Sequence, residues 1–112
     1  MDPGCFMRVG YEVFHHDVAA LVRFYVDVLG FEPLPSDQEE KFVVVQRDIV
    51  RVGCTFHEDA SPGPADRPPP TGSEIVLRVE DVDAEYVQVV RSGWPVADAL
   101  REQTWGLRDF RL

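Results

Sequence analysis

Two stretches of the chain repeat the same order of segments, and this duplication constrains the fold more than any other feature. In the first stretch, residues 7–14 (MRVGYEVF) place apolar side chains at every second position, which predicts a half-buried strand. Asp17 then offers a helix N-cap, apolar residues follow at helical spacing, and Gly30 stands where a helix typically ends. The order is strand, capped helix and glycine stop.

The same order returns about 64 residues later. Residues 74–81 (EIVLRVED) alternate like a strand, Asp81 is a second N-cap candidate, and the apolar stripe that follows ends before Gly93. A duplication at this spacing predicts two similar modules, each built from a strand, a helix and further strands, rather than a solenoid.

The remaining segments complete the two modules. Residues 41–46 (KFVVVQ) and 48–57 (DIVRVGCTFH) have the composition of two strands, which a hairpin can join. In the second module, residues 94–104 form an extended stretch and residues 105–112 a last strand.

A proline-rich segment separates the modules. Residues 58–73 contain five prolines and two glycines, a composition typical of a surface linker. We therefore predict a single domain in which module one occupies about residues 7–57 and module two occupies residues 74–112.

Composition and charge exclude several classes of protein. The chain has 112 residues, 45% of them hydrophobic, which suffices for one domain with its own core. Its 20 acidic and 11 basic residues would repel a nucleic-acid backbone, and no apolar run approaches the roughly 20 residues of a membrane helix. Cys5 and Cys54 lie far apart, so we expect free thiols, a reducing cytoplasmic setting, and neither nucleic-acid nor membrane partners.

The segment VRFYVDVLGFEPLP (residues 22–35) resembles the module of the vicinal-oxygen-chelate superfamily, which covers glyoxalase I, extradiol dioxygenases, fosfomycin-resistance enzymes and bleomycin-resistance proteins. Similarity to bleomycin-resistance proteins in particular lies in VVVQRDIVRV (43–52), EQTWG (102–106) and RDFRL (108–112). The resemblance implies an α+β fold of paired βαβββ modules, whose strands curl as a mixed sheet around a cavity with the helices on the outer face. Family members continue with one more strand after the position of Leu112, and we expect further residues there.

Enzymes of this superfamily hold a divalent metal with side chains from strands of both modules. Carried over to this chain, the ligand positions fall on Gly10, on Gly53 or its neighbour Cys54, and on Glu74, while the last position lies beyond the chain. A first-row metal site wants at least three protein ligands. The resemblance therefore implies no metal and no other cofactor.

The three histidines do not change this expectation. His15 and His16 are adjacent in a strand-to-helix turn, where we expect their side chains to diverge, and His57 sits at the end of a predicted strand beside the linker. We interpret all three as solvated turn residues.

Period-two alternation sorts each predicted strand into two sides. The helix-facing side carries apolar residues: Val9, Tyr11 and Val13; Val50, Val52, Cys54 and Phe56; Ile75, Leu77 and Val79; Phe110 and Leu112. The opposite side carries one arginine in each of four strands and glycine at two of the former ligand positions. Glycine leaves room for a flat ligand, arginine stacks on aromatic rings, and two tryptophans and a phenylalanine offer aromatic walls.

The predicted ligand-binding residues are Arg8, Gly10, Glu12, Phe42, Arg51, Gly53, Thr55, Glu74, Arg78, Trp94, Trp105, Asp109 and Arg111, with no catalytic residue among them. The alternative is that the arginines belong to a solvated ion network and that Trp94 packs under the second helix. The resemblance implies metal-independent sequestration of an aromatic small-molecule or peptide antibiotic, or a related natural product, by a homodimer that can exchange modules. Two rival functions are a metal-dependent glyoxalase-like lyase or dioxygenase, and a structural partner with a collapsed cavity.

Overall fold

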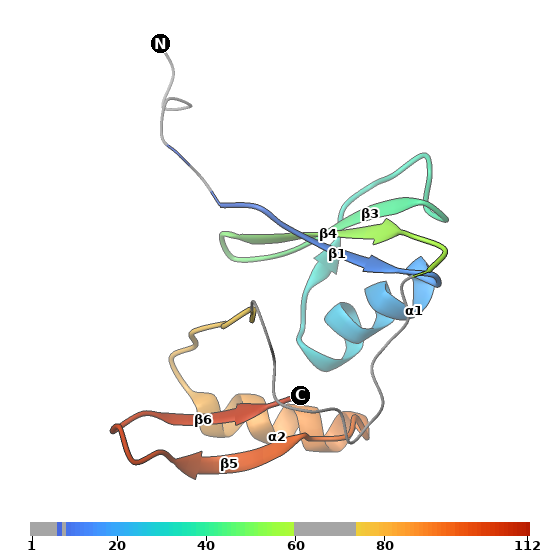
Figure 1. The fold of residues 1–112 in the computed structure, drawn as a ribbon. Helices are drawn as coiled ribbons and strands as arrows, with labels where there is room; N and C mark the ends of the chain where they lie inside the picture. The colour runs from blue at the N-terminus through green and yellow to red at the C-terminus, as the bar shows by residue number, and fades with distance from the viewer. Residues whose placement is uncertain (1–6, 8, 60–73) are drawn as a thin grey trace. The chain divides into compact units, whose positions relative to one another are not determined.

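The computed structural model describes residues 7, 9–59 and 74–112, which belong to two compact units. Unit 1 lies within residues 1–61 and unit 2 within residues 62–112, so that the division falls inside the predicted linker. Most of that linker, like Arg8 and Cys5, lies outside the described residues. The two helices and the mixed sheet confirm the predicted α+β class (Figure 1).

Unit 1 is a four-stranded sheet with a helix on one face (Figure 1). The strands β1 (Tyr11–His15), β2 (Glu32–Pro33), β3 (Phe42–Arg47) and β4 (Val50–Phe56) stand in the order β1-β4-β3-β2. β1 is parallel to β4, and the other pairs are antiparallel. Asp48, one of the few residue types that tolerate a positive φ, adopts φ 52° in the turn of the predicted β3–β4 hairpin.

The helix of unit 1 has the predicted ends. α1 (Val18–Arg23) begins after Asp17, whose carboxylate accepts a hydrogen bond from the Ala20 backbone N–H at 3.1 Å. It continues as the π-helical turn η2 (Phe24–Val28), which the apolar spacing did not predict. Gly30 ends the helix with φ 73°, a left-handed conformation that glycine adopts at little cost.

The core of unit 1 lies between the helix and the sheet. Val52 and Cys54 are fully buried, as predicted for the helix-facing side of β4, and so is Val45 of β3. Val9 and Tyr11 were also predicted on the helix-facing side, but Val9 is 75% exposed and Tyr11 is 40% exposed. β1 pairs with β4 only from Tyr11 onward, so Val9 lies outside the paired part of the strand.

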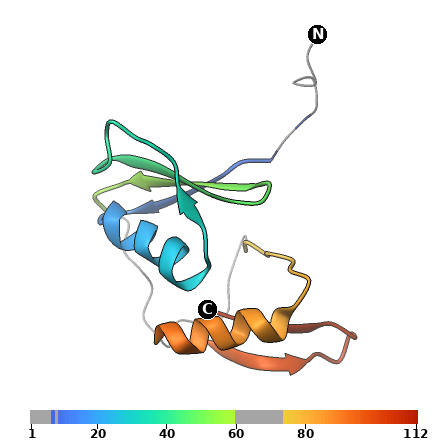
Figure 2. The same cartoon turned by 180° about the vertical axis from the view of Figure 1, so that it is seen from behind.

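Unit 2 consists of one helix and one hairpin. α2 (Val82–Ser92) runs along the antiparallel pair β5 (Asp98–Glu102) and β6 (Arg108–Arg111), as Figure 2 shows. The α2 N-cap repeats that of α1, because the Asp81 carboxylate accepts from the Ala84 backbone N–H at 3.0 Å, and Gly93 ends the helix with φ 82°.

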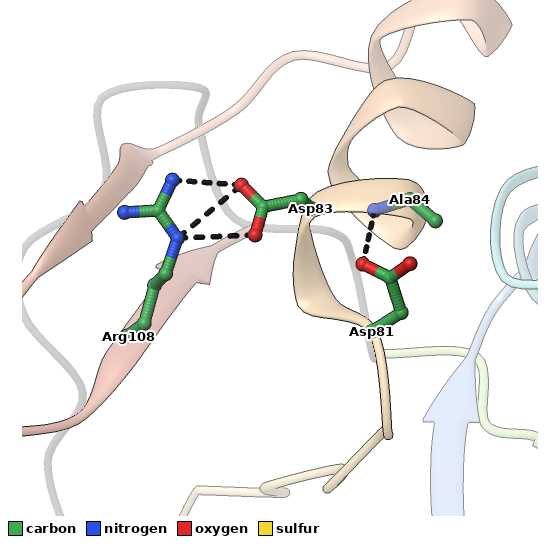
Figure 3. A network of polar contacts seen from close by, with 4 residues as sticks. All are labelled: Asp81, Asp83, Ala84 and Arg108. Carbon is green, nitrogen blue, oxygen red and sulfur yellow. Dashed lines mark hydrogen bonds and ion pairs between the residues drawn. The ribbon is translucent and has the colours of Figure 1, made fainter.

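Two contacts join α2 to β6. The rings of Tyr86 and Phe110 meet edge to face, with 5.0 Å between their centroids. The Arg108 guanidinium donates to both carboxylate oxygens of Asp83, with a shortest distance of 2.7 Å (Figure 3). This hydrogen-bonded partner lowers the pKa of Asp83. Phe110 thus faces the helix, as the alternation predicts.

The predicted strand at residues 74–81 is wrong, because the structure assigns no strand to this segment. In unit 1 the equivalent strand, β1, obtains its hydrogen bonds from β4. The described part of unit 2 has only β5 and β6 after the helix, and these two pair with each other. Residues 75–79 therefore make no backbone hydrogen bond to any described residue, and alternation alone does not hold a strand.

Candidate functional site

The face of the unit 1 sheet that points away from α1 gathers the predicted site residues of the first module. The strand register places Gly53 between Glu12 and Val44, and Thr55 between Phe14 and Phe42. We call this surface the open face, and its members are Gly10, Glu12, Phe14, Phe42, Val44, Gln46, Arg51, Gly53 and Thr55. Its composition contrasts with the opposite face, where Val43, Val45, Val52 and Cys54 are buried.

The two glycines of the open face differ in what surrounds them. A Cβ built on Gly10 would meet nothing within 4 Å. A Cβ on Gly53 would stand 3.1 Å from Cε1 of Phe42 and 3.3 Å from Cγ of Glu12, closer than ordinary contact. The space that the sequence reserves for a ligand above Gly53 is therefore occupied by the ring of Phe42, itself a predicted ligand contact.

Thr55 carries a polar atom without a partner. Its hydroxyl oxygen is buried and makes no hydrogen bond. Thr55 lies opposite Phe42 on one side and Phe14 on the other, so two aromatic residues flank it in the sheet. An unsatisfied buried hydroxyl costs about 1–3 kcal/mol, which makes this position a candidate for a ligand hydrogen bond.

The arginine of the open face has a fixed neighbour. Arg51 Nε donates to Oε1 of Gln46 at 2.7 Å, across the β3–β4 hairpin. Sequence reasoning missed Gln46, Phe14 and Val44. Counting outward from the two-residue turn at Asp48 would have paired Gln46 with Arg51, because hairpin register follows from turn length.

The predicted site residues of unit 2 form polar pairs around β6. Arg111 Nε lies 3.6 Å from Oε2 of Glu74, and Asp109 accepts a hydrogen bond from Gln103 Nε2 at 2.7 Å. Arg111 and Asp109 alternate with Phe110, so they point away from α2. The Arg111–Glu74 pair agrees with the ion-network alternative as well as with a ligand site.

Three further predicted residues of unit 2 lie on its surface. Trp105 is 63% exposed in the turn between β5 and β6, beside Gly106 with φ 88°. Trp94 follows α2 and is also exposed, and Arg78 lies in the segment that forms no strand. These side chains are accessible to solvent, as a ligand contact has to be.

The buried ionisable groups of unit 1, Cys54 and Tyr25, lie on the helix side of the sheet and remain protonated at neutral pH. Burial raises the pKa of the Cys54 thiol to about 11 and that of Tyr25 to about 12. Cys54 is therefore protonated at neutral pH, which does not suit a nucleophile or a metal ligand. Its position facing the helix agrees with a packing role.

The histidines are arranged differently from our expectation. The rings of His15 and His16 do not diverge but stack, with 4.7 Å between their centroids. The His15 ring is held over the turn because its Nδ1 accepts a hydrogen bond from the Asp17 backbone N–H at 2.8 Å. His57 Nδ1 accepts from the Asp59 backbone N–H in the same way. Within the described ranges, no group of three or more His, Cys, Asp or Glu side chains is arranged to hold a metal.

A hollow in unit 1 lies apart from the open face. It has a volume of about 460 Å³, opens to solvent, and is lined by His16, Asp17, Val18, Ala19, Glu39, Glu40, Lys41 and Phe56. Lys41 Nζ stands 5.2 Å above the centre of the Phe56 ring. None of the predicted site residues lines this hollow.

The chain belongs to the Glyoxalase/Bleomycin resistance protein/Dioxygenase superfamily, whose sequence profile matches residues 9–111. The predicted family is thereby confirmed. No curated protein sequence matches the chain. In the part of the chain that the structure describes, no helix has both the length and the apolar character needed to cross a membrane.

Solved structures show the same fold at low identity. The chain is similar to the bleomycin-binding protein of bleomycin-producing Streptomyces verticillus, solved with copper(II)-bleomycin, with 24% identity, a TM-score of 0.62, and coverage of 94% of this chain and 84% of that one. It is similar to a bleomycin resistance determinant encoded on transposon Tn5, with 18% identity, a TM-score of 0.68, and coverage of 92% and 84%. A lactoylglutathione lyase from Agrobacterium tumefaciens has 17% identity, a TM-score of 0.64, and coverage of 93% and 82%.

Proposed function

We propose that this protein binds and sequesters an aromatic antibiotic, or a related natural product, without using a metal. The observation that carries the proposal is the open face, where two exposed phenylalanines flank the residue with an unpartnered hydroxyl and a guanidinium lies further along the same strand. Ligand sites combine aromatic walls with a few placed polar groups in this way. Glycine at positions 10 and 53, where the family resemblance implies metal ligands, supports binding without chelation.

We propose that residues of unit 2 also contact the ligand. The aromatic residues among them are Trp94 and Trp105, and the charged residues are Glu74, Arg78, Asp109 and Arg111. We propose that two copies associate as a cytoplasmic homodimer, in which both copies contribute residues to each binding site. Light scattering at micromolar concentration tests this part, because a monomer mass that persists with ligand would contradict it.

A thermal-shift screen tests the function itself. Bleomycin, mitomycin and a quinoxaline-bearing peptide antibiotic are the first compounds to test, each at a concentration about 100 times an expected micromolar Kd. A ligand that binds only the folded state stabilises it by about 2.7 kcal/mol at that excess, which raises the Tm by several degrees. A non-aromatic sugar of similar mass serves as the control. An unchanged Tm with every aromatic compound would overturn the proposal.

The structural similarity to a lactoylglutathione lyase favours one alternative, a metal-dependent lyase or dioxygenase. This function requires a stoichiometric divalent metal and consumption of a substrate. Elemental analysis of the purified protein after incubation with Ni, Zn, Mn and Fe distinguishes it from sequestration. One bound metal per chain together with turnover would replace our proposal.

A further inference from the structure

We propose that Phe42 is a displaceable cover over a binding slot on β4, and that a ligand enters by taking the place of its ring. The slot is formed by Arg51, Gly53 and Thr55, which alternate along β4 and point to the open face. This inference rests on the proposed function, since it names how the open face receives a planar ligand and which atoms it uses.

The contact with Gly53 shows what Phe42 covers. Its Cε1 and Cζ atoms lie 3.1 and 3.6 Å from the position that a Gly53 Cβ would occupy. Phe42 itself pairs with Thr55 in the register, so the ring starts opposite Thr55 and ends above Gly53. Only a residue without a side chain at position 53 leaves a flat space of this kind on a sheet.

Phe42 is placed where it can move. It is the first residue of β3 and keeps 38% of its surface exposed, so it is not held on all sides by the core. Partly exposed side chains change rotamer on the picosecond to nanosecond timescale. A rotation that carries the ring toward solvent frees the space above Gly53 without breaking any hydrogen bond of the β3–β4 ladder.

The polar atoms beside the slot specify the ligand. The buried Thr55 hydroxyl at one end has no partner, and Arg51, whose guanidinium donates to Gln46, lies at the other end. The complementary ligand is a flat, bicyclic aromatic ring that has one hydrogen-bonding atom on its edge for Thr55 and an acceptor on the opposite side for Arg51. It replaces the stacking of Phe42 on the sheet and gives Thr55 its missing partner.

The test uses two probes of equal shape, quinoxaline-2-carboxamide and naphthalene-2-carboxamide, which differ only in their ring nitrogens. Dissociation constants are measured by NMR titration of the full chain. We expect Phe42→Ala to bind both probes about tenfold more tightly than the wild type, because the slot is then always open. We expect Thr55→Val to abolish the preference for quinoxaline while leaving naphthalene binding unchanged.

Two variants serve as controls. Phe56→Ala removes an equally exposed phenylalanine from the opposite side of the sheet, and it is expected to leave both dissociation constants unchanged. Gly53→Ala fills the slot and is expected to raise the dissociation constants of both probes about tenfold. Weaker or unchanged binding by Phe42→Ala would overturn the inference, since a fixed aromatic wall would lose contacts in that variant.

A measurement on the wild type decides the matter if Phe42→Ala does not fold. Nuclear Overhauser contacts between the Phe42 ring protons and the Gly53 α protons are expected to vanish when quinoxaline-2-carboxamide is added, and persistence of these contacts with bound probe would contradict the cover. If neither probe binds wild type or variant while an antibiotic from the thermal-shift screen does, this inference fails and the proposed function stands. If none of these compounds binds, both fail.

Discussion

The residues of the unit 1 sheet show that its two faces are under different constraints. On the helix side, Val45, Val52 and Cys54 are fully buried and pack the core. On the other side, a glycine admits an aromatic ring and a threonine hydroxyl stays unpaired. Packing explains the first set, but an unpaired buried hydroxyl lowers stability, which is typical of residues kept for binding.

Thr55→Val is predicted to stabilise the protein. Valine keeps the branched shape and removes the unpaired hydroxyl, so the free energy of unfolding should rise by about 1 kcal/mol. Urea denaturation measures the change, and Thr104→Val, in the exposed turn before β6, is the matched control with no expected effect. A loss of stability in Thr55→Val would mean that the hydroxyl has a partner in solution.

The sequence predicted several residues of the open face but not the contacts between them. Alternation placed Glu12, Arg51, Gly53 and Thr55 on one side of their strands, as the register has them. It predicted free space above Gly53, where the structure has the ring of Phe42. The difference arises because that contact crosses from β3 to β4, and a pattern read along one strand contains no information about a neighbour on another.

At the scale of elements, the two helices share their local chemistry. Both begin with an Asp-Val pair whose aspartate accepts a hydrogen bond from the backbone N–H three residues later, and both end at a glycine with positive φ. These signals are local in sequence, which is why the helix boundaries were predicted correctly. The π-helical turn of Phe24–Val28 and the two-residue β2 carry no comparable local signal.

Removal of a helix cap tests this symmetry. Asp17→Ala and Asp81→Ala are each predicted to lower the free energy of unfolding by about 1 kcal/mol, because one backbone N–H per helix loses its acceptor. Asp17→Asn and Asp81→Asn retain a side-chain oxygen and should restore most of that loss. Circular dichroism during urea titration gives both values. Equal losses for alanine and asparagine would show that the carboxylate charge, not the hydrogen bond, is what matters.

The segment at residues 74–79 shows where an element depends on its partner. Its alternation is as clear as that of β1, yet only β1 is a strand, because β4 supplies its hydrogen bonds. A strand exists only as part of a sheet, whereas the first turn of a helix finds its partners within the same segment.

At the scale of the whole molecule, the proposed function predicts that Trp105 of unit 2 contacts the ligand. Trp105 is the more exposed of the two tryptophans. It lies in a turn, where its side chain contributes little to packing. Solvent-exposed aromatic residues at turns commonly serve recognition, since they lose apolar exposure only when a partner covers them.

Trp105→Ala is therefore predicted to weaken antibiotic binding by about 1–3 kcal/mol while leaving the Tm of the free protein almost unchanged. Isothermal titration with the best compound from the thermal-shift screen measures the affinity. Leu107→Ala, an exposed apolar residue of the same turn, is the matched control and should bind normally. Unchanged affinity in Trp105→Ala would remove this residue from the proposed site.

The amino-acid sequence by itself determined the class of fold, the family, both helix boundaries, and the side of β1, β4 and β6 that carries polar residues. These properties follow from interactions between residues close together in the chain, so periodicity and caps reveal them. Only the tertiary structure decided which strands form and what lies above Gly53, and it alone left the Thr55 hydroxyl without a partner. Those outcomes depend on pairing between strands, which brings distant residues into contact.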